Sequence, residues 1–179
     1  MTDHLRWLVP ATAALAFSQH CYGVQYFTVE QARQLMFADA KEFVPAPLKL
    51  TGEQAKEIER ISGVRVRTPE QAVWVARADG KSLGWFIVDE VYGKHELITY
   101  AVALAADGSV RQIEVLEYRE GYGYEIRNPN WRRQFVGKRV DDPLKLDQDI
   151  KNITGATLSC RHVTEGVKRL LATYRVAMQ

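Results

Sequence analysis

Two stretches in the N-terminal part of the chain place apolar residues every three to four positions, which is the period of an amphipathic helix. The first stretch covers residues 28–43 and opens with a capping box, a Thr with a Gln three positions later. Pro45 and Pro47 follow it, so we expect that helix to end there in a stiff connector. The second stretch opens with the same box at Thr51 and stops at Gly63. The pattern therefore predicts two N-terminal helices.

From residue 73 the apolar positions change to the patterning of β-strands. Four such runs follow one another with short turns between them, at residues 73–76, 85–88, 97–104 and 110–116. Asp-Gly pairs stand in the first and third turns, at 79–80 and 107–108, and this dipeptide favours tight hairpins. Short connections between successive strands predict an antiparallel meander.

A third helical stripe closes the chain and covers about four turns. Its apolar residues fall on one face: Val163, Val167, Leu170, Leu171 and Tyr174. A helix of this kind can cover one face of the sheet. Together the elements predict an α+β fold, an antiparallel β-sheet meander packed with helices, plus two N-terminal helices.

The start of the last helix carries a run of small and hydroxyl residues, Thr154-Gly155-Ala156-Thr157. Thr157 or Ser159 can cap the helix with its hydroxyl group. The free N–H groups and the positive dipole end of a helix start attract phosphate, and the small residues let it approach the backbone. The run therefore indicates a phosphate site beside a hydroxyl. The alternative is an ordinary capped helix entry with no ligand.

A second informative block follows the last strand. Gly121-Tyr122-Gly123 places two glycines around one aromatic residue, so that the backbone can bend sharply and approach a flat ligand. The alternative is a plain turn with Tyr122 packed on the sheet. Trp131 and Phe135, four positions apart, are expected to anchor a short helix in the core.

Composition narrows the functional classes. The 179 residues, 46% of them hydrophobic, suit one domain with a substantial core, and a net charge of +2 gives no reason to expect a nucleic-acid partner. Arg132, Arg133 and Lys138 are expected on a solvated face, with a phosphate or an acidic partner as the alternative. Three of the four histidines are scattered and show no metal-type spacing, and the two cysteines define no disulfide framework. These residues are His20, His95, His162, Cys21 and Cys160.

The N-terminus resembles a secretory leader. Arg6 precedes an apolar segment at residues 7–17, whose length fits the h-region of a signal peptide. The alternative is a short buried helix. We expect a signal peptide or leader over residues 1–23, an N-terminal helical region over 24–72 and a ligand-binding domain over 73–179.

The helix start and the glycine pair together resemble the FMN-binding domain family. That family includes the FMN-carrying subunits of the sodium-translocating NADH:quinone reductase and of a related ferredoxin-linked membrane complex. The residues that carry the resemblance are the 154–157 run, with Asp149 before it and Ser159 after it, and the block at 121–138. It extends over roughly residues 84–172. Lys151 stands where the family usually has Asp, three positions before the first hydroxyl residue of the motif.

The resemblance implies that Thr157 is esterified to the phosphate of FMN by a dedicated flavin transferase, with FAD as the donor. It implies cofactor contacts from both blocks, with Tyr122 near the isoalloxazine ring. The cofactor-binding residues are then Thr154, Gly155, Ala156, Thr157, Leu158, Ser159, Gly121, Tyr122 and Gly123.

We therefore expect an exported electron-transfer flavoprotein, periplasmic or otherwise extracytoplasmic, with redox protein partners that include membrane-bound ones. The sequence offers no grouping of His, Cys and carboxylates to bind and protonate a substrate, so an electron carrier is favoured over a self-contained enzyme. An FMN-dependent reductase of a small molecule and a nonredox binding domain on the same fold are the two alternatives.

Overall fold

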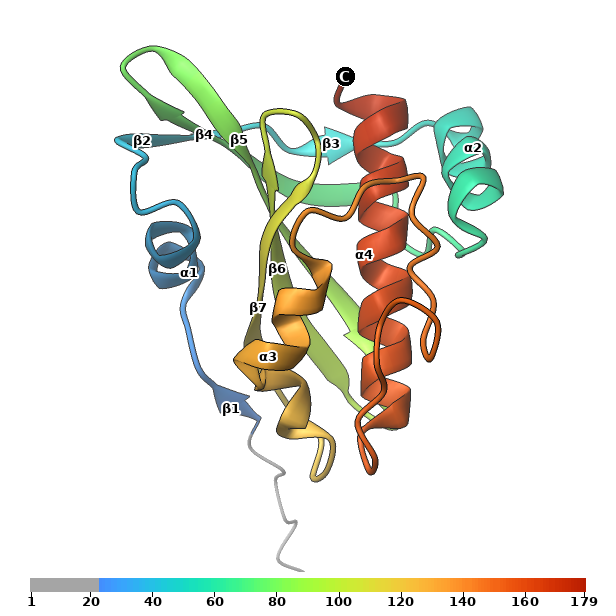
Figure 1. The fold of residues 1–179 in the computed structure, drawn as a ribbon. Helices are drawn as coiled ribbons and strands as arrows, with labels where there is room; N and C mark the ends of the chain where they lie inside the picture. Colours follow the sequence, from blue (N-terminus) through green and yellow to red (C-terminus); the bar gives the residue numbers. More distant parts are fainter. Residues whose placement is uncertain (1–22) are drawn as a thin grey trace, which may run out of the picture.

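In the computed structural model, which describes residues 23–179, a twisted antiparallel sheet carries a long C-terminal helix across one face (Figure 1). The strand order is β1-β7-β6-β5-β4-β2, and β3 pairs with β4 off this path. The strands are β1 (Val24–Gln25), β2 (Glu42–Pro45), β3 (Leu48–Lys49), β4 (Glu70–Ala78), β5 (Lys81–Tyr92), β6 (Leu97–Ala105) and β7 (Val110–Tyr118). The helices are α1 (Val29–Met36), α2 (Gly52–Ser62), α3 (Pro129–Arg132) and α4 (Thr157–Ala177), with short 3-10 turns η1 (Tyr124–Arg127) and η2 (Arg133–Phe135).

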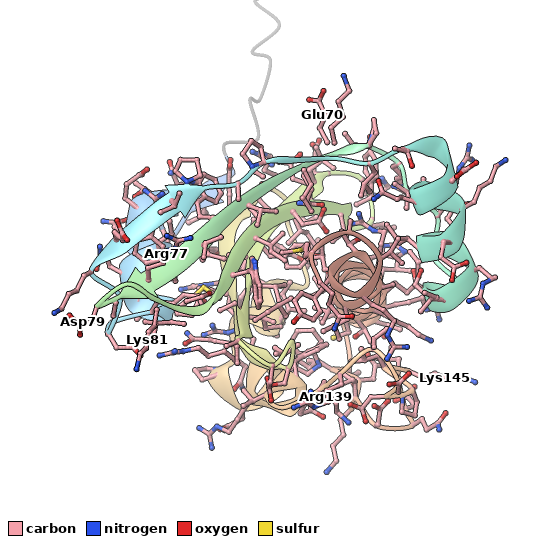
Figure 2. The ribbon with its side chains drawn as sticks, turned by 90° about the horizontal axis from the view of Figure 1, so that it is seen from above. Glu70, Arg77, Asp79, Lys81, Arg139 and Lys145 are labelled. Carbon is pink, nitrogen blue, oxygen red and sulfur yellow. The ribbon has the colours of Figure 1, made fainter. Side chains whose placement is uncertain are left out.

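Strands β4 to β7 form the predicted antiparallel meander, which is confirmed. Asp79 and Gly80 both adopt positive φ, 51° and 74°, as a tight turn between β4 and β5 requires. Charged side chains line this hairpin, and Figure 2 shows Arg77, Asp79 and Lys81 at the periphery of the molecule, far from the axis of α4.

Strand β6 is buried on both faces, which explains its nearly continuous apolar sequence. Tyr100 and Val102 belong to the cluster that packs under α4, whereas Ala101 and Ala103 belong to a second cluster that includes Met36 of α1. Successive side chains of a strand point to opposite faces. The sheet is therefore covered by α4 on one side and by α1 on the other.

The first predicted helix is shorter than its stripe indicated. Both capping boxes are present, but α1 ends at Met36, and the expectation that it continues to Phe43 is wrong. Phe43 instead pairs with Ala76 as part of β2, and its ring lies 6.3 Å from that of Phe37. Pro45 is the last residue of β2 and not part of a connector, and it is tolerated there because β2 is an outer strand of the sheet.

Helix α4 packs on the sheet through the stripe that the sequence shows, and α2 lies beside it (Figure 1). The Trp85 ring of β5 meets the Tyr174 ring at a centroid distance of 4.9 Å. Ile58 of α2 and Ala172 of α4 share a smaller buried cluster. These contacts fix the axis of α4, and hence the place of its first turn.

Residues 1–22 of the predicted leader, with His20 and Cys21, lie outside the described residues. Within residues 23–179, no helix combines the length and the apolar character needed to cross a bilayer. Strands β1 and β2 hydrogen-bond to β7 and β4, so parts of the 24–72 region contribute to the same sheet as the later strands. The division at residue 72 stays a prediction.

Candidate functional site

Helix α4 begins without help from a side chain. Ala156 is the N-cap residue, and no side chain of the described range caps this end of the helix. The expectation that Thr157 or Ser159 serves as N-cap is wrong. Thr157 is the first helical residue and its hydroxyl accepts a hydrogen bond from Asn152 Nδ2 at 3.0 Å. The first-turn N–H groups are therefore left to solvent or to a ligand.

The approach to the helix leaves room for a bulky group. Gly155 has φ +89°, and in the described structure no heavy atom lies within 4 Å of where its Cβ would stand. Thr154 and Gly155 are exposed, whereas Ala156 is 2% exposed and belongs to the main core. The helix start is thus anchored in the core by Ala156, whereas the space beside Gly155 is free.

The glycine block, Gly121-Tyr122-Gly123, lies against this helix start. Tyr118, the last residue of β7, donates its hydroxyl hydrogen to the Tyr122 carbonyl at 2.6 Å and lies 2.9 Å from Ser159 Oγ. A Cβ on Gly123, whose φ is +92°, would lie 2.6 Å from the Tyr118 hydroxyl oxygen and 2.8 Å from Ser159 Oγ. The two sequence blocks are therefore in direct contact, and glycine is required where they touch.

The surface beside Thr157 carries exposed apolar groups. Tyr122 is 87% exposed, so the alternative that packs it on the sheet is wrong. Leu158 is 39% exposed and Tyr124 is 56% exposed. Exposed side chains of this kind can lie along a flat ligand without rearrangement of the core.

The hydroxyl of Tyr118, which makes the hydrogen bonds between the glycine block and the helix start, is neutral. Burial raises the pKa of Tyr118 to about 12, although the hydrogen bond with Ser159 works in the opposite direction. Because the single Tyr118 proton goes to the Tyr122 carbonyl, Ser159 must donate to the Tyr118 oxygen. The Ser159 hydroxyl hydrogen is thus already used within the fold.

Asp149 organises the loop that leads to the site. Its carboxylate accepts from Lys138 Nζ at 2.9 Å and from the backbone N–H groups of Leu144 and Lys145 at 3.1 and 2.8 Å. Partial burial raises the pKa of Asp149, but these donors together hold it below its usual value. Asp149 is therefore engaged inside its own loop.

Other predicted residues of the second block are structural. Trp131 and Phe135 are buried with their rings 5.1 Å apart, as expected of core anchors. Arg132 pairs with the buried Glu114, and Arg133 is exposed. Lys138 is occupied by Asp149, so of the three basic residues Arg133 fits the expected solvated face best.

Nothing in the described range indicates a metal centre or a reactive thiol. No group of three His, Cys, Asp or Glu side chains among residues 23–179 is placed to hold a metal ion. Burial raises the pKa of the Cys160 thiol, which keeps it protonated and unreactive. His162 Nδ1 lies 2.5 Å from the Tyr92 carbonyl oxygen.

Sequence reasoning missed three residues of this site. Tyr118 contacts Ser159, which lies 41 positions later in the sequence, and Asn152 contacts Thr157, which lies 5 positions later. Glu120 accepts from three successive backbone N–H groups, including that of Glu96 at 2.8 Å, and so fixes the turn between β5 and β6 against the glycine block. No local spacing predicts any of these contacts.

The residues present fit a phosphate at the start of α4. The uncapped amides supply donors, the first turn holds no acidic residue, and Gly155 leaves space for the group. Tyr122 and Leu158 offer exposed apolar surface for a ring system.

A cleft of about 330 Å³ lies between β5 and α4. Of the residues that line it, His162 is the one nearest to the start of α4. The cleft does not include Thr157. Thr154, Gly155 and Tyr122 are exposed, so a ligand at the helix start would lie on an open face.

Comparisons with known proteins agree with this chemistry. Residues 93–172 match the FMN-binding domain family. The G subunit of the Na(+)-translocating ferredoxin:NAD(+) oxidoreductase complex of Acetobacterium woodii is 24% identical over 183 residues, which cover 94% of this chain and 88% of that protein. The C subunit of the Na(+)-translocating NADH-quinone reductase of Yersinia pestis is 36% identical over 122 residues, 58% of this chain and 46% of that protein.

Two further comparisons support the relationship. The G subunit of the proton-translocating ferredoxin:NAD(+) oxidoreductase complex of Clostridium ljungdahlii is 32% identical over 103 residues, 53% of this chain and 56% of that protein. The matches thus span about half the length of the Yersinia and Clostridium relatives. The crystal structure of Shewanella oneidensis NqrC has the same fold, with a TM-score of 0.54 and 18% identity over 87% of this chain and 92% of that one. The comparisons thus relate residues 93–172 of this chain to the FMN-binding domain family and point to FMN as the cofactor.

Proposed function

We propose that this chain is an electron-carrying flavoprotein whose FMN is attached to the Thr157 hydroxyl through a phosphoester. The observation that carries the proposal is the position of Thr157, a partly exposed hydroxyl at the uncapped first turn of α4. The helix amides would hold the phosphate, and Tyr122 and Leu158 would lie along the ring. Bound FMN supplies one- and two-electron redox chemistry, which the protein tunes through hydrogen bonds and burial.

Attachment requires a separate enzyme. The hydrogen bond that Thr157 Oγ1 makes comes from the amide of Asn152, and an amide cannot accept the proton of a nucleophile. The partner is therefore a flavin transferase that uses FAD as donor and supplies its own base. The chain provides the acceptor hydroxyl and the surface around it.

A covalent bond suits the openness of the site. Thr154, Gly155 and Tyr122 are exposed, so noncovalent contacts would enclose little of the flavin. A tether keeps the local concentration of the cofactor high and independent of free FMN. This matters most in a compartment outside the cytoplasm, to which the predicted leader would direct the protein.

Electron transfer between proteins fits the site better than catalysis on a small molecule. The side chains around Thr157 and the glycine block include hydroxyls, an amide and apolar groups: Tyr118, Ser159, Asn152, Tyr122 and Leu158. The Glu120 carboxylate beside them is occupied by three backbone N–H groups. These side chains are not suited to protonating a substrate. The relatives from Acetobacterium and Yersinia are named as subunits of oxidoreductase complexes, so we infer redox protein partners, including membrane-bound ones.

The test is intact mass of the chain produced with and without the flavin transferase. We expect a gain of one FMN phosphoester, its loss in Thr157→Ala, and its retention in Thr154→Ala, because Thr154 is exposed and lies outside the helix. Modification of Thr154 would overturn the assignment of the residue. A colourless product would favour a nonredox binding domain, and steady turnover of a defined small acceptor would favour a reductase.

A further inference from the structure

Asn152 lies beside the attachment hydroxyl in a loop whose path is fixed on its other side. The preceding residue, Lys151, donates its backbone N–H to Gln134 Oε1 at 2.8 Å and accepts from Trp131 Nε1 at 2.8 Å. Ala156 closes the loop with a hydrogen bond from its N–H to the Ile153 carbonyl at 3.0 Å. The side chain of Asn152 is thus presented to Thr157 by a backbone anchored at both ends.

The carboxamide of Asn152 is only half satisfied. Its Nδ2 donates to Thr157 Oγ1 at 3.0 Å, whereas its Oδ1 is buried and has no hydrogen-bond partner in the described part of the chain. A side chain that served the loop alone would be expected to use both ends, because an unpaired buried oxygen is unfavourable. The contact that Asn152 does make is the one to Thr157.

We propose that Asn152 is a positioning residue for flavin attachment, which prepares the Thr157 hydroxyl for transfer through its Nδ2–H group. This inference rests on the proposed function. In the transfer, Thr157 Oγ1 forms a bond to the FMN-side phosphorus of FAD, the phosphoanhydride bond breaks and AMP leaves. The Thr157 proton passes to a base of the transferase.

The donated hydrogen bond acts on this step in two ways. It holds the Thr157 side chain in one orientation at the helix start, with the hydroxyl hydrogen left free for removal. It also stabilises the negative charge that develops on Oγ1 as the proton leaves, in the same direction as the N-terminal dipole of α4. Loss of the donor should therefore slow transfer without weakening recognition of the chain by the transferase.

The experiment measures the initial rate of FMN attachment by intact mass, with purified transferase and FAD, over a range of concentrations of the full chain. Asn152→Ala and Asn152→Asp should both lower kcat by roughly tenfold or more, with KM for the chain unchanged. Asn152→Asp is nearly isosteric and keeps an acceptor but lacks the donor. Asn130→Asp, an exposed change elsewhere, should transfer at the wild-type rate, and Thr157→Ala gives the zero baseline.

The outcomes separate this inference from the proposed function. A wild-type or faster rate in Asn152→Asp would overturn the donor role, as would a change confined to KM. Thermal melting checks the fold of each variant, and if Asn152→Ala melts early, Asn152→Asp alone decides the donor role. Absence of FMN from Thr157 in the wild-type chain would instead contradict the proposed function.

Discussion

The hydroxyl of Tyr118 at the end of β7 and that of Ser159 in the first turn of α4 lie 2.9 Å apart. The two residues are 41 positions apart in the sequence, and their contact joins the glycine block to the helix start. Because Tyr118 also donates to the Tyr122 carbonyl, one phenol sets the spacing of both parts of the candidate flavin site. The site depends on this link for its shape.

Tyr118→Phe is expected to destabilise the protein by about 1–3 kcal/mol, because it leaves the Tyr122 carbonyl and the Ser159 hydroxyl without their partner. Chemical denaturation gives the free energy of unfolding directly. Tyr124→Phe is the matched control, since Tyr124 is 56% exposed, and should change the free energy by less than about 0.5 kcal/mol. Equal stability of the two variants would contradict the proposed importance of the link.

Gly123→Ala should be costly and Gly121→Ala nearly neutral. At Gly123 a methyl group would meet Tyr118 and Ser159 at 2.6 and 2.8 Å, and the backbone there has φ +92°. At Gly121, by contrast, no described heavy atom lies within 4 Å of the added carbon. We expect a loss of about 1–3 kcal/mol for the first variant, measured by thermal and chemical unfolding. A comparable loss in Gly121→Ala would show that the loop is constrained in some other way.

Asp89→Asn should strongly destabilise the fold away from the candidate flavin site. Asp89 and Arg169 form an ion pair at 2.6 Å with side chains 9% and 11% exposed, and the Tyr100 hydroxyl also donates to Asp89. Removal of one partner of such a pair leaves a buried charge and costs about 3–5 kcal/mol. Asp141→Asn breaks the exposed pair with Arg175 and should cost less than about 1 kcal/mol. Urea unfolding of both variants makes the comparison.

The stability contributed by Asp149 should disappear in acid. Its pKa in the folded protein lies below the ordinary 3.8, so the unfolded chain takes up the proton first as pH falls. The contribution is therefore complete above the ordinary pKa and is lost as pH falls through the folded value. Unfolding free energies between pH 6 and pH 2 should show wild type and Asp149→Asn converging at the acid end. The exposed Asp147, in the same loop, provides the control as Asp147→Asn.

Local patterns were sufficient for the elements whose cause is local. The Asp79-Gly80 hairpin, the capping boxes at Thr28 and Thr51, and the apolar stripe of α4 each depend on a few neighbouring residues, and all are present. The small residues before Thr157 likewise identified the helix start. Neighbouring residues were not sufficient at Phe43, where pairing with β4 overrides the continuation of a helical stripe.

The sequence by itself determined the meander, the long last helix and the hydroxyl of Thr157 at the start of that helix. The reason is that hydrophobic periodicity, turn chemistry and residue size act over short distances. Only the tertiary structure decided that Tyr118 would join the two blocks, that Ser159 would be used inside the fold and that Asn152 would reach Thr157. The physical reason is that these hydrogen bonds depend on where the packing of α4 on the sheet places its first turn. That placement results from contacts such as Trp85 with Tyr174, made by residues far apart in the chain.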